Sequence, residues 1–409
     1  MPSHSSHLDW IDTLHDQVCQ QVTDWCNINS GTENLAGIAA MAEVLRKEFG
    51  VLGGTFEEVP VPPAESIDSR GRPTQISLGP ALRFTKRHPV SPDPSGSGHR
   101  PLRVLLNIHR DTVYGIGDPF QSCTLLDANT LRGPGVVDAK GGLAVMLAAL
   151  RTLERSPYAE RIGWEVLINS DEEIGSPGSA ALLARAAREN DLGLLFEPAL
   201  PDGSLVSRRR GTGNFTVVLH GRSAHAGRDF ERGRSAIVAL AELIVQLHAL
   251  NGAMPGVTVN VGRVEGGGAF NVVPDLAIAR VNVRTTEPQD EGRIVSELRR
   301  IVAAAGAKDG IAAELHGGIT SPPKLPDDRT RRLMEMVESC GRDLGLPIHW
   351  RDSGGASDGN KLAAAGLPNI DTLGPRGGNI HSPDEFLLLD SLVERAKLTA
   401  LLLMKLADE

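Results

Sequence analysis

Side chains that could do chemistry follow the predicted strands of this chain. Three short apolar runs, at residues 102–108, 164–168 and 192–196, have strand length and alternate with predicted helices. In parallel sheets, ligands bind at the carboxyl ends of the strands, so we expect the residues that follow these runs to lie together. They are His109 and Asp111 after the first run, Asp171, Glu172 and Glu173 after the second, and Glu197 after the third.

Two more residues are expected at the same edge. Asp138 lies in a glycine-bearing loop, Gly133–Asp138, that leads into a predicted helix, and His381 follows a strand predicted at 369–373. Each residue alone has an ordinary interpretation: Asp138 could cap its helix, and His381 could be a surface histidine. The convergence of acids and histidines at one rim is more specific than any one motif.

Divalent cations would explain such a cluster, because carboxylates packed together repel one another and burial increases the repulsion. Histidine nitrogens with carboxylate oxygens form a ligand set that suits Zn²⁺, with Mn²⁺ or Co²⁺ as alternatives. One shared carboxylate can hold two ions about 3.5–4 Å apart, as two-metal hydrolysis requires.

The spacing within the motifs suggests a division of labour. His109 and Asp111 point to the same side of an extended segment, so His109 can bind a metal while Asp111 orients a neighbouring ligand from behind. The adjacent Glu172 and Glu173 point differently, so one can bind a metal while the other faces a bound water as a general base.

The elements that must position these residues predict an α/β fold with a largely parallel, doubly covered sheet. From about residue 212 the predicted order changes to β-α-β-β-α-β, which is typical of a ferredoxin-like α+β unit. We therefore predict a discontinuous domain of residues 1–206 plus 319–409, with a second domain inserted at 207–318. Residues 60–101, rich in Pro, Ser and Gly, are expected to form a surface excursion without chemistry.

Composition excludes several classes of function. The 409 residues carry a formal net charge of -9, and the only basic run, Arg208–Arg210, is short and isolated, which argues against a nucleic-acid partner. No apolar stretch of about 18 residues predicts a membrane helix, and the polar segment Met1–Trp10 predicts no signal peptide. The four scattered cysteines favour a cytoplasmic protein with reduced thiols.

With these residues in place, the sequence resembles the co-catalytic zinc metallopeptidases that include glutamate carboxypeptidase, acetylornithine deacetylase, succinyl-diaminopimelate desuccinylase and aminoacylase. The resemblance covers most of the chain except residues 60–101. Its motifs, in order, are His109–Val113, Gly133–Gly142, Asp171–Ser176, Glu197–Pro198, His220–Gly227, Asn271–Pro274 and His381–Phe386.

The resemblance implies a role for each motif. Asp138 would bridge two metal ions, with His109 and Glu197 completing one site and Glu173 and His381 the other. Glu172 would be the general base, and Asp111 would orient the ligands. The inserted domain would be a lid through which a homodimer forms.

For substrate, the resemblance implies residues on the inserted domain and near it. His225 of the lid would stabilise the oxyanion in the partner's site, and Arg284 would receive a substrate carboxylate. Asn271 would contact substrate, and Gly355 belongs to a loop, Gly354–Asp358, that would line the pocket.

The predicted activity is hydrolysis of an amide bond beside a free carboxylate, with a peptide or an N-acyl amino acid as substrate. Short motifs favour the glutamate carboxypeptidase branch, with an N-acyl-amino-acid deacylase such as acetylornithine deacetylase as the alternative. Two further hypotheses are a non-catalytic binding protein on the same scaffold and a metal-free hydrolase that uses Glu172 and Asp171 as an acid–base pair.

Overall fold

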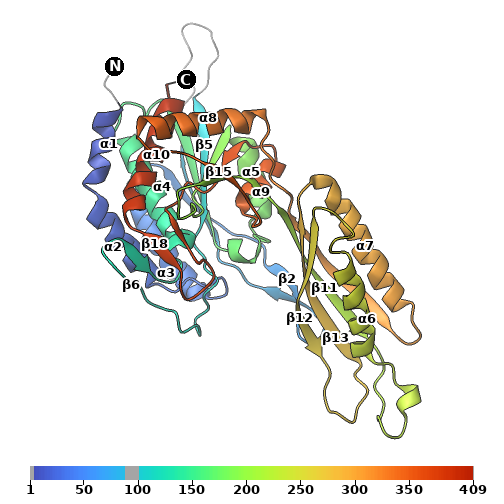
Figure 1. Cartoon of the computed structure of the whole chain (residues 1–409). Coiled ribbons are helices and arrows are strands. Elements are labelled where there is room, and N and C mark those ends of the chain that lie inside the picture. The colour runs from blue at the N-terminus through green and yellow to red at the C-terminus, as the bar shows by residue number, and fades with distance from the viewer. Residues whose placement is uncertain (1–3, 88–100, 409) are drawn as a thin grey trace.

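A computed structural model describes residues 4–87 and 101–408. Figure 1 shows a layered α/β body and, to one side of it, an elongated sheet with two helices on one face, which we call the projection (residues 211–321). Both ends of the described chain lie in the body. No helix among the described residues is long and apolar enough to cross a membrane.

The body is built on a mixed six-stranded sheet. Its strands, in spatial order, are β1 (Thr55–Val59), β4 (Ala81–Lys86), β8 (Ile162–Asn169), β5 (Leu102–His109), β9 (Leu192–Leu195) and β16 (Asn369–Ile370). The last four run parallel, but β4 is antiparallel to both β8 and β1. The prediction of a largely parallel sheet is therefore wrong at this edge, where β4, from a segment expected to be irregular, and β1 extend the sheet.

Successive residues of the central strand pack into different clusters. Val104 and Leu106 of β5 lie in the largest apolar cluster, whereas Leu105 faces a smaller one. Helices of the large cluster are α1 (Ser5–Asp12), α2 (His15–Cys26), α3 (Leu35–Gly50), α4 (Gly141–Glu154), α8 (Asp328–Asp343) and α10 (Asp390–Leu406). The smaller cluster takes side chains from α5 (Ala180–Glu189) and α9 (Asp358–Ala364).

Residues 60–87 are more ordered than the composition of the segment 60–101 predicts. They contain β2 (Ala64–Ile67), β3 (Pro73–Ile76) and β4, and β2 pairs with β3 as an antiparallel hairpin. In β4, Ala81, Leu82 and Phe84 are buried, so packing stabilises the strand. The proline-rich composition of the segment did not predict this packing. Residues 88–100 lie outside the described part of the chain.

The projection follows the predicted order of elements. It consists of β11 (Gly211–His220), α6 (Ala236–Ala249), β12 (Val257–Gly266), β13 (Leu276–Thr285), α7 (Pro288–Gly306) and β14 (Ala312–Ser321). The sheet is antiparallel in the order β12-β13-β11-β14, and α6 and α7 cover one face around a separate apolar cluster. Alternate residues of each strand therefore face away from the helices.

Short elements complete the rim of the body. β10 (Leu205–Arg209) pairs with β15 (Trp350–Ser353), and a small sheet contains β17 (Gly377–Gly378), β18 (Phe386–Leu388), β7 (Thr130–Arg132) and β6 (Thr124–Leu125). Two single turns carry acidic residues: η1 (Val136–Lys140) holds Asp138, and η2 (Glu172–Ile174) holds Glu172 and Glu173. The Asp138–Ala139 peptide bond is cis.

Candidate metal centre

Asp138 lies at the centre of the predicted cluster. Its Oδ1 atom is 3.1 Å from Nε2 of His109, and its Oδ2 atom is 3.4 Å from Nε2 of His381. The two oxygens of one carboxylate thus face two histidines that are far apart in the chain. This is the arrangement that a bridging carboxylate requires.

Two glutamates complete the cluster, one beside each histidine. The Oε2 atom of Glu173 is 3.1 Å from Nε2 of His381, and the Oε1 atom of Glu197 is 3.8 Å from Nε2 of His109. Potential ligand atoms of His109, Asp138 and Glu173 all lie within 4.8 Å of one another. All five predicted ligand residues are therefore brought to one place, at the carboxyl ends of β5, β8 and β9.

Asp111 supports the cluster from behind. Nδ1 of His109 is 3.0 Å from the carbonyl oxygen of Asp111, which leaves Nε2 directed at the centre. The fully buried carboxylate of Asp111 accepts hydrogen bonds from Thr32 Oγ1 (2.8 Å) and from the backbone N–H groups of Glu172 (3.3 Å) and Glu173 (3.2 Å). Asp111 thereby fixes the histidine through its backbone carbonyl oxygen, and it fixes the turn that carries the two glutamates through its carboxylate.

Glu385 is a buried residue of the site whose role the sequence did not reveal. Its carboxylate accepts hydrogen bonds from the backbone N–H groups of Gly135 (3.1 Å), Val137 (3.0 Å) and Asp138 (3.1 Å), and from the hydroxyl of Tyr114 (2.7 Å). It therefore holds the loop that presents Asp138. The only sequence signal was its place in the last motif, four residues after His381.

The electrostatics of the cluster reflect an excess of buried acid. Burial raises the pKa of Glu173 to about 7 and that of Glu197 to about 8, and burial followed by the charge of Glu197 raises the pKa of Glu172 well above its usual value. Burial acts in the same direction on Asp138, but hydrogen bonds from the two histidines outweigh it and lower the pKa of that carboxyl.

The acidic neighbours favour the protonated form of the two histidines and raise their pKa values. Hydrogen bonds with Asp138 and Glu173 raise the pKa of His381 to about 10. For His109, burial favours the neutral ring, yet hydrogen bonds with Asp111 and Asp138 raise its pKa well above the usual value. The cluster attracts positive charge, and its nitrogen and oxygen donors are those that Zn²⁺, Mn²⁺ and Co²⁺ accept. The residues present therefore suit divalent cations.

A cavity of about 850 Å³ opens from this cluster. Glu172 lines it, with no side-chain partner engaging its carboxylate among the described residues. Arg284 and Gly355 line the same cavity. Burial, and secondarily the charge of Arg210, lowers the pKa of the Arg284 guanidinium, and that side chain hydrogen-bonds Asn282 Oδ1 at 3.0 Å.

Arg209 shapes this wall, although the sequence presents it only as part of a basic run. It is buried, forms an ion pair with Asp371, and donates from Nη1 to the carbonyl oxygen of Gly355 at 3.2 Å. The run Arg208–Arg210 is therefore structural at its centre. It supports the pocket loop instead of forming a charged surface.

His225 and Asn271 are not brought to the pocket of their own chain. Both are exposed and lie together in the projection, where the N–H of Ala226 donates to the carbonyl oxygen of Asn271 at 2.9 Å. Neither is among the described residues that line the cavity around Asp138.

Asp171 faces away from the cluster. Its carboxylate accepts hydrogen bonds from the backbone N–H groups of Gly178 (2.8 Å) and Ser179 (3.0 Å) and from the Ser179 hydroxyl (2.5 Å). It therefore fixes the segment before α5. The hypothesis of a Glu172–Asp171 acid–base pair is wrong, because Asp171 is committed to this structural role.

Relatives are known across nearly the whole chain. Carboxypeptidase G2 of Pseudomonas sp. (strain RS-16) is 27% identical over 386 residues, which cover 93% of this chain and 87% of that protein. Among solved structures, the di-peptidase Dug1p from Saccharomyces cerevisiae matches with a TM-score of 0.76 and 15% identity, covering 100% of this chain and 99% of that one.

A second structure of the same fold is the YXEP protein of Bacillus subtilis, described as a dinuclear metal binding peptidase. It matches with a TM-score of 0.64 and 17% identity, covering 97% of this chain and 99% of that one. The family described as peptidase family M20/M25/M40 matches residues 105–405, which include every residue of the cluster. This chain belongs to peptidase family M20/M25/M40 and is a metal-dependent hydrolase.

Proposed function

We propose that the protein removes the C-terminal residue of a peptide by hydrolysing an amide bond next to a free carboxylate. The observation that carries the proposal is the position of Asp138 between two histidines, each beside a glutamate, in a cavity that also contains Arg284. The relation to carboxypeptidase G2 supports the same substrate class.

The proposed cofactors are two divalent cations, most favourably Zn²⁺, with Co²⁺ or Mn²⁺ as alternatives. His109 and Glu197 would bind one ion, Glu173 and His381 the other, and Asp138 both. The opposed contacts of the two Asp138 oxygens support this division. When bound, such ions polarise an amide carbonyl and lower the pKa of a water molecule.

The chain's own residues would do the remaining work. The guanidinium of Arg284 binds the terminal carboxylate, which suits its bidentate geometry. Glu172 accepts the proton of the attacking water and returns it to the leaving amine. Asp111 holds His109 in the tautomer that directs Nε2 at the centre.

The projection would act as a lid and as the surface of a homodimer. In this proposal residues 1–206 plus 319–409 form the catalytic domain and 207–318 the inserted one. α6 exposes Ile237, Ala241 and Val245 at four-residue intervals, and β12 is an edge strand beside it. An apolar stripe next to an unpaired edge suits contact with a second copy.

Dimerisation would give His225 and Asn271 a function, because they lie outside their own chain's pocket. His225 would reach the partner's site and stabilise the oxyanion there. The cytoplasmic location expected from the sequence is part of the same proposal.

The alternative activity is that of an N-acyl-amino-acid deacylase such as acetylornithine deacetylase. Arg284 favours it equally, since an N-acyl amino acid presents the same carboxylate beside the same amide. A panel of dipeptides and N-acyl amino acids, assayed with Zn²⁺, Mn²⁺ and Co²⁺ in turn, separates the two activities. Preference for the acetylated amino acids over every peptide would overturn the carboxypeptidase assignment.

The role of Glu172 is tested by Glu172→Gln, which removes the base and keeps the shape of the side chain. We expect turnover to fall about 10²–10⁴-fold, as for loss of a general base, while the metal content measured after purification is unchanged. Wild-type turnover in the variant would refute the assignment. Full activity of chelator-treated protein would refute the metal mechanism.

A further inference from the structure

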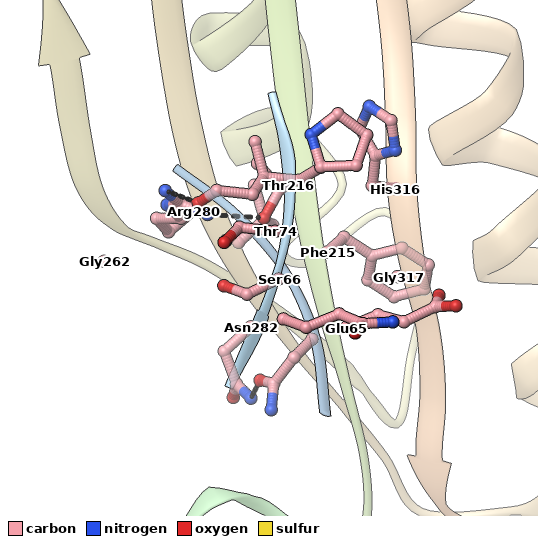
Figure 2. A pocket seen from close by; sticks show the side chains of 15 residues that line it. Glu65, Ser66, Thr74, Phe215, Thr216, Gly262, Arg280, Asn282, His316 and Gly317 are labelled. Carbon is pink, nitrogen blue, oxygen red and sulfur yellow. Dashed lines mark hydrogen bonds between the residues drawn. The ribbon is translucent and has the colours of Figure 1, made fainter. Parts of the chain in front are cut away.

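A second cavity, of about 810 Å³, lies outside the metal cluster. The β2–β3 hairpin of the body lies over the face of the projection sheet that has no helices, and the cavity, which is open to solvent, lies between them (Figure 2). Figure 2 shows Glu65, Ser66 and Thr74 of the hairpin opposite Thr216 and Arg280 of the sheet. Nothing in the proposed reaction at the metal centre uses this space.

The hairpin is fixed to the sheet at its turn. Ile67 forms a small buried cluster with Val218 and Ile278, and its carbonyl oxygen accepts a hydrogen bond from Arg280 Nη2 at 2.6 Å. Gly71 has a φ of 74°, and a Cβ atom there would lie 2.7 Å from Val218 Cγ1. Contact this close requires glycine and shows that the hairpin packs directly on the sheet.

The floor of this cavity continues into the catalytic pocket. Asn214 and Asn282 line both spaces. Nδ2 of Asn282 donates to Oδ1 of Asn214 at 2.8 Å, and Oδ1 of Asn282 accepts from Nε of Arg284 at 3.0 Å. A row of hydrogen-bonded side chains therefore runs from the proposed carboxylate-binding arginine to the second cavity.

The dimensions match an extended peptide. Arg284 and Arg280 are four residues apart on β13, a span of about 14 Å, which about four residues of an extended chain would cover. Pockets of roughly 300–1,000 Å³ enclose most of a drug-sized ligand. Two adjoining cavities of about 810 and 850 Å³ therefore hold more than one acylated amino acid.

The lining suits uncharged, hydrogen-bonding groups. Ser66, Thr74 and Gln75 offer hydroxyl and amide groups, as peptide backbone requires. Arg280 already forms an ion pair with Glu265, with Nη2 and Oε2 3.3 Å apart, and its Nη1 atom donates to Thr216 Oγ1 at 3.1 Å. An anionic occupant is disfavoured because the exposed carboxylate of Glu65 also lines the space.

We propose that this second cavity binds the residues upstream of the scissile bond, so that the preferred substrate is an extended peptide with a free terminal carboxylate. The inference rests on the proposed carboxypeptidase function and specifies its substrate class. With the terminal residue at Arg284, the chain passes Asn282 and Asn214 and enters the space under the hairpin.

The test is a series of alanine peptides that end in the same residue and lengthen from dipeptide to pentapeptide. For the wild-type enzyme we expect kcat/KM to rise with length. Thr74→Trp fills the cavity from the hairpin. Ser66→Leu fills it from the other strand of the hairpin, away from the proposed dimer surface. Ser69→Trp adds the same bulk at the exposed hairpin turn and is the matched control.

Both cavity-filling variants should lose at least about tenfold in kcat/KM for the pentapeptide, equivalent to about 1.4 kcal/mol, and keep wild-type kcat/KM for the dipeptide. Ser69→Trp should match wild type on both. Equal losses on short and long peptides, or no loss, overturn the inference. A wild-type enzyme that cleaves dipeptides without any gain from length overturns it while the proposed function stands. If no peptide in the series is cleaved, the carboxypeptidase function itself is refuted.

Discussion

The body and the projection differ in the kind of side chain that each buries and exposes. In the body, Asp111 is 0% exposed and each of its carboxylate oxygens has a partner within the chain. In the projection, Phe270 is fully exposed and Val245 is 69% exposed. The body buries charged side chains at the site where catalysis is expected. The projection exposes apolar side chains on the surface where contact with a second copy is expected. The proposal of a homodimer through the projection rests on this difference.

The largest effect is expected when two inactive variants are mixed, which tests whether one subunit contributes His225 to the site of the other. His225→Ala alone should reduce turnover about 10²–10³-fold, the effect of removing one oxyanion donor, and Glu172→Gln alone should also be nearly inactive. A co-refolded mixture contains heterodimers with one intact site, so activity should recover to about a quarter of wild type. The measurement is turnover of a fixed total of protein against the mixing ratio.

Val245→Glu places a charge in the exposed apolar stripe of α6 and serves as the control. Introduced into both partners, it should abolish the recovery and halve the mass measured by light scattering. Recovery with monomeric protein, or wild-type turnover of His225→Ala, would contradict contact in trans.

A smaller effect is expected within the body, at Glu385. Glu385→Ala removes the acceptor of three backbone hydrogen bonds in the loop of Asp138. Metal affinity should fall about 10–100-fold, as for other residues that support metal ligands. Titration calorimetry of metal-free protein measures this loss. Glu385→Gln retains acceptor capacity and should recover part of the affinity, and equal affinities for all three proteins would contradict a positioning role.

The smallest effect concerns Lys324, which is buried beside Asp371 and Arg209. Burial lowers its pKa from 10.5 to about 8. Between these values the unfolded chain binds more protons, so this group makes stability rise with pH across the window of about 8 to 10.5. The unfolding free energy of wild type relative to Lys324→Met should rise by about 1–3 kcal/mol between pH 8 and 10. A flat or falling difference would contradict this sign.

The body shows which sequence signals are reliable. β5, predicted at 102–108, spans 102–109, and β8, predicted at 164–168, spans 162–169, because continuous apolar runs dominate both. β4 was missed because its alternating pattern is short and lies among prolines. The mixed sheet follows from that omission.

For the site, the rule that ligands gather at strand ends anticipated the convergence of His109, Glu173 and Glu197. Sequence could not anticipate Glu385 or Arg209, since each acts through backbone groups of residues more than 140 positions away. Such contacts depend on tertiary structure and leave no local pattern. The metal roles and the contact of His225 in trans remain predictions.

The hydrogen bonds from the Asp138 loop to Glu385 have a consequence for biosynthesis. During translation His109, Asp138, Glu173 and Glu197 leave the ribosome before the projection, residues 211–321, and His381 and Glu385 leave after it. Domains generally fold as units as they emerge. The projection can therefore fold while the loop of Asp138 still lacks its anchor, and with the proposed ligands metal loading would be a late event in the maturation of the enzyme.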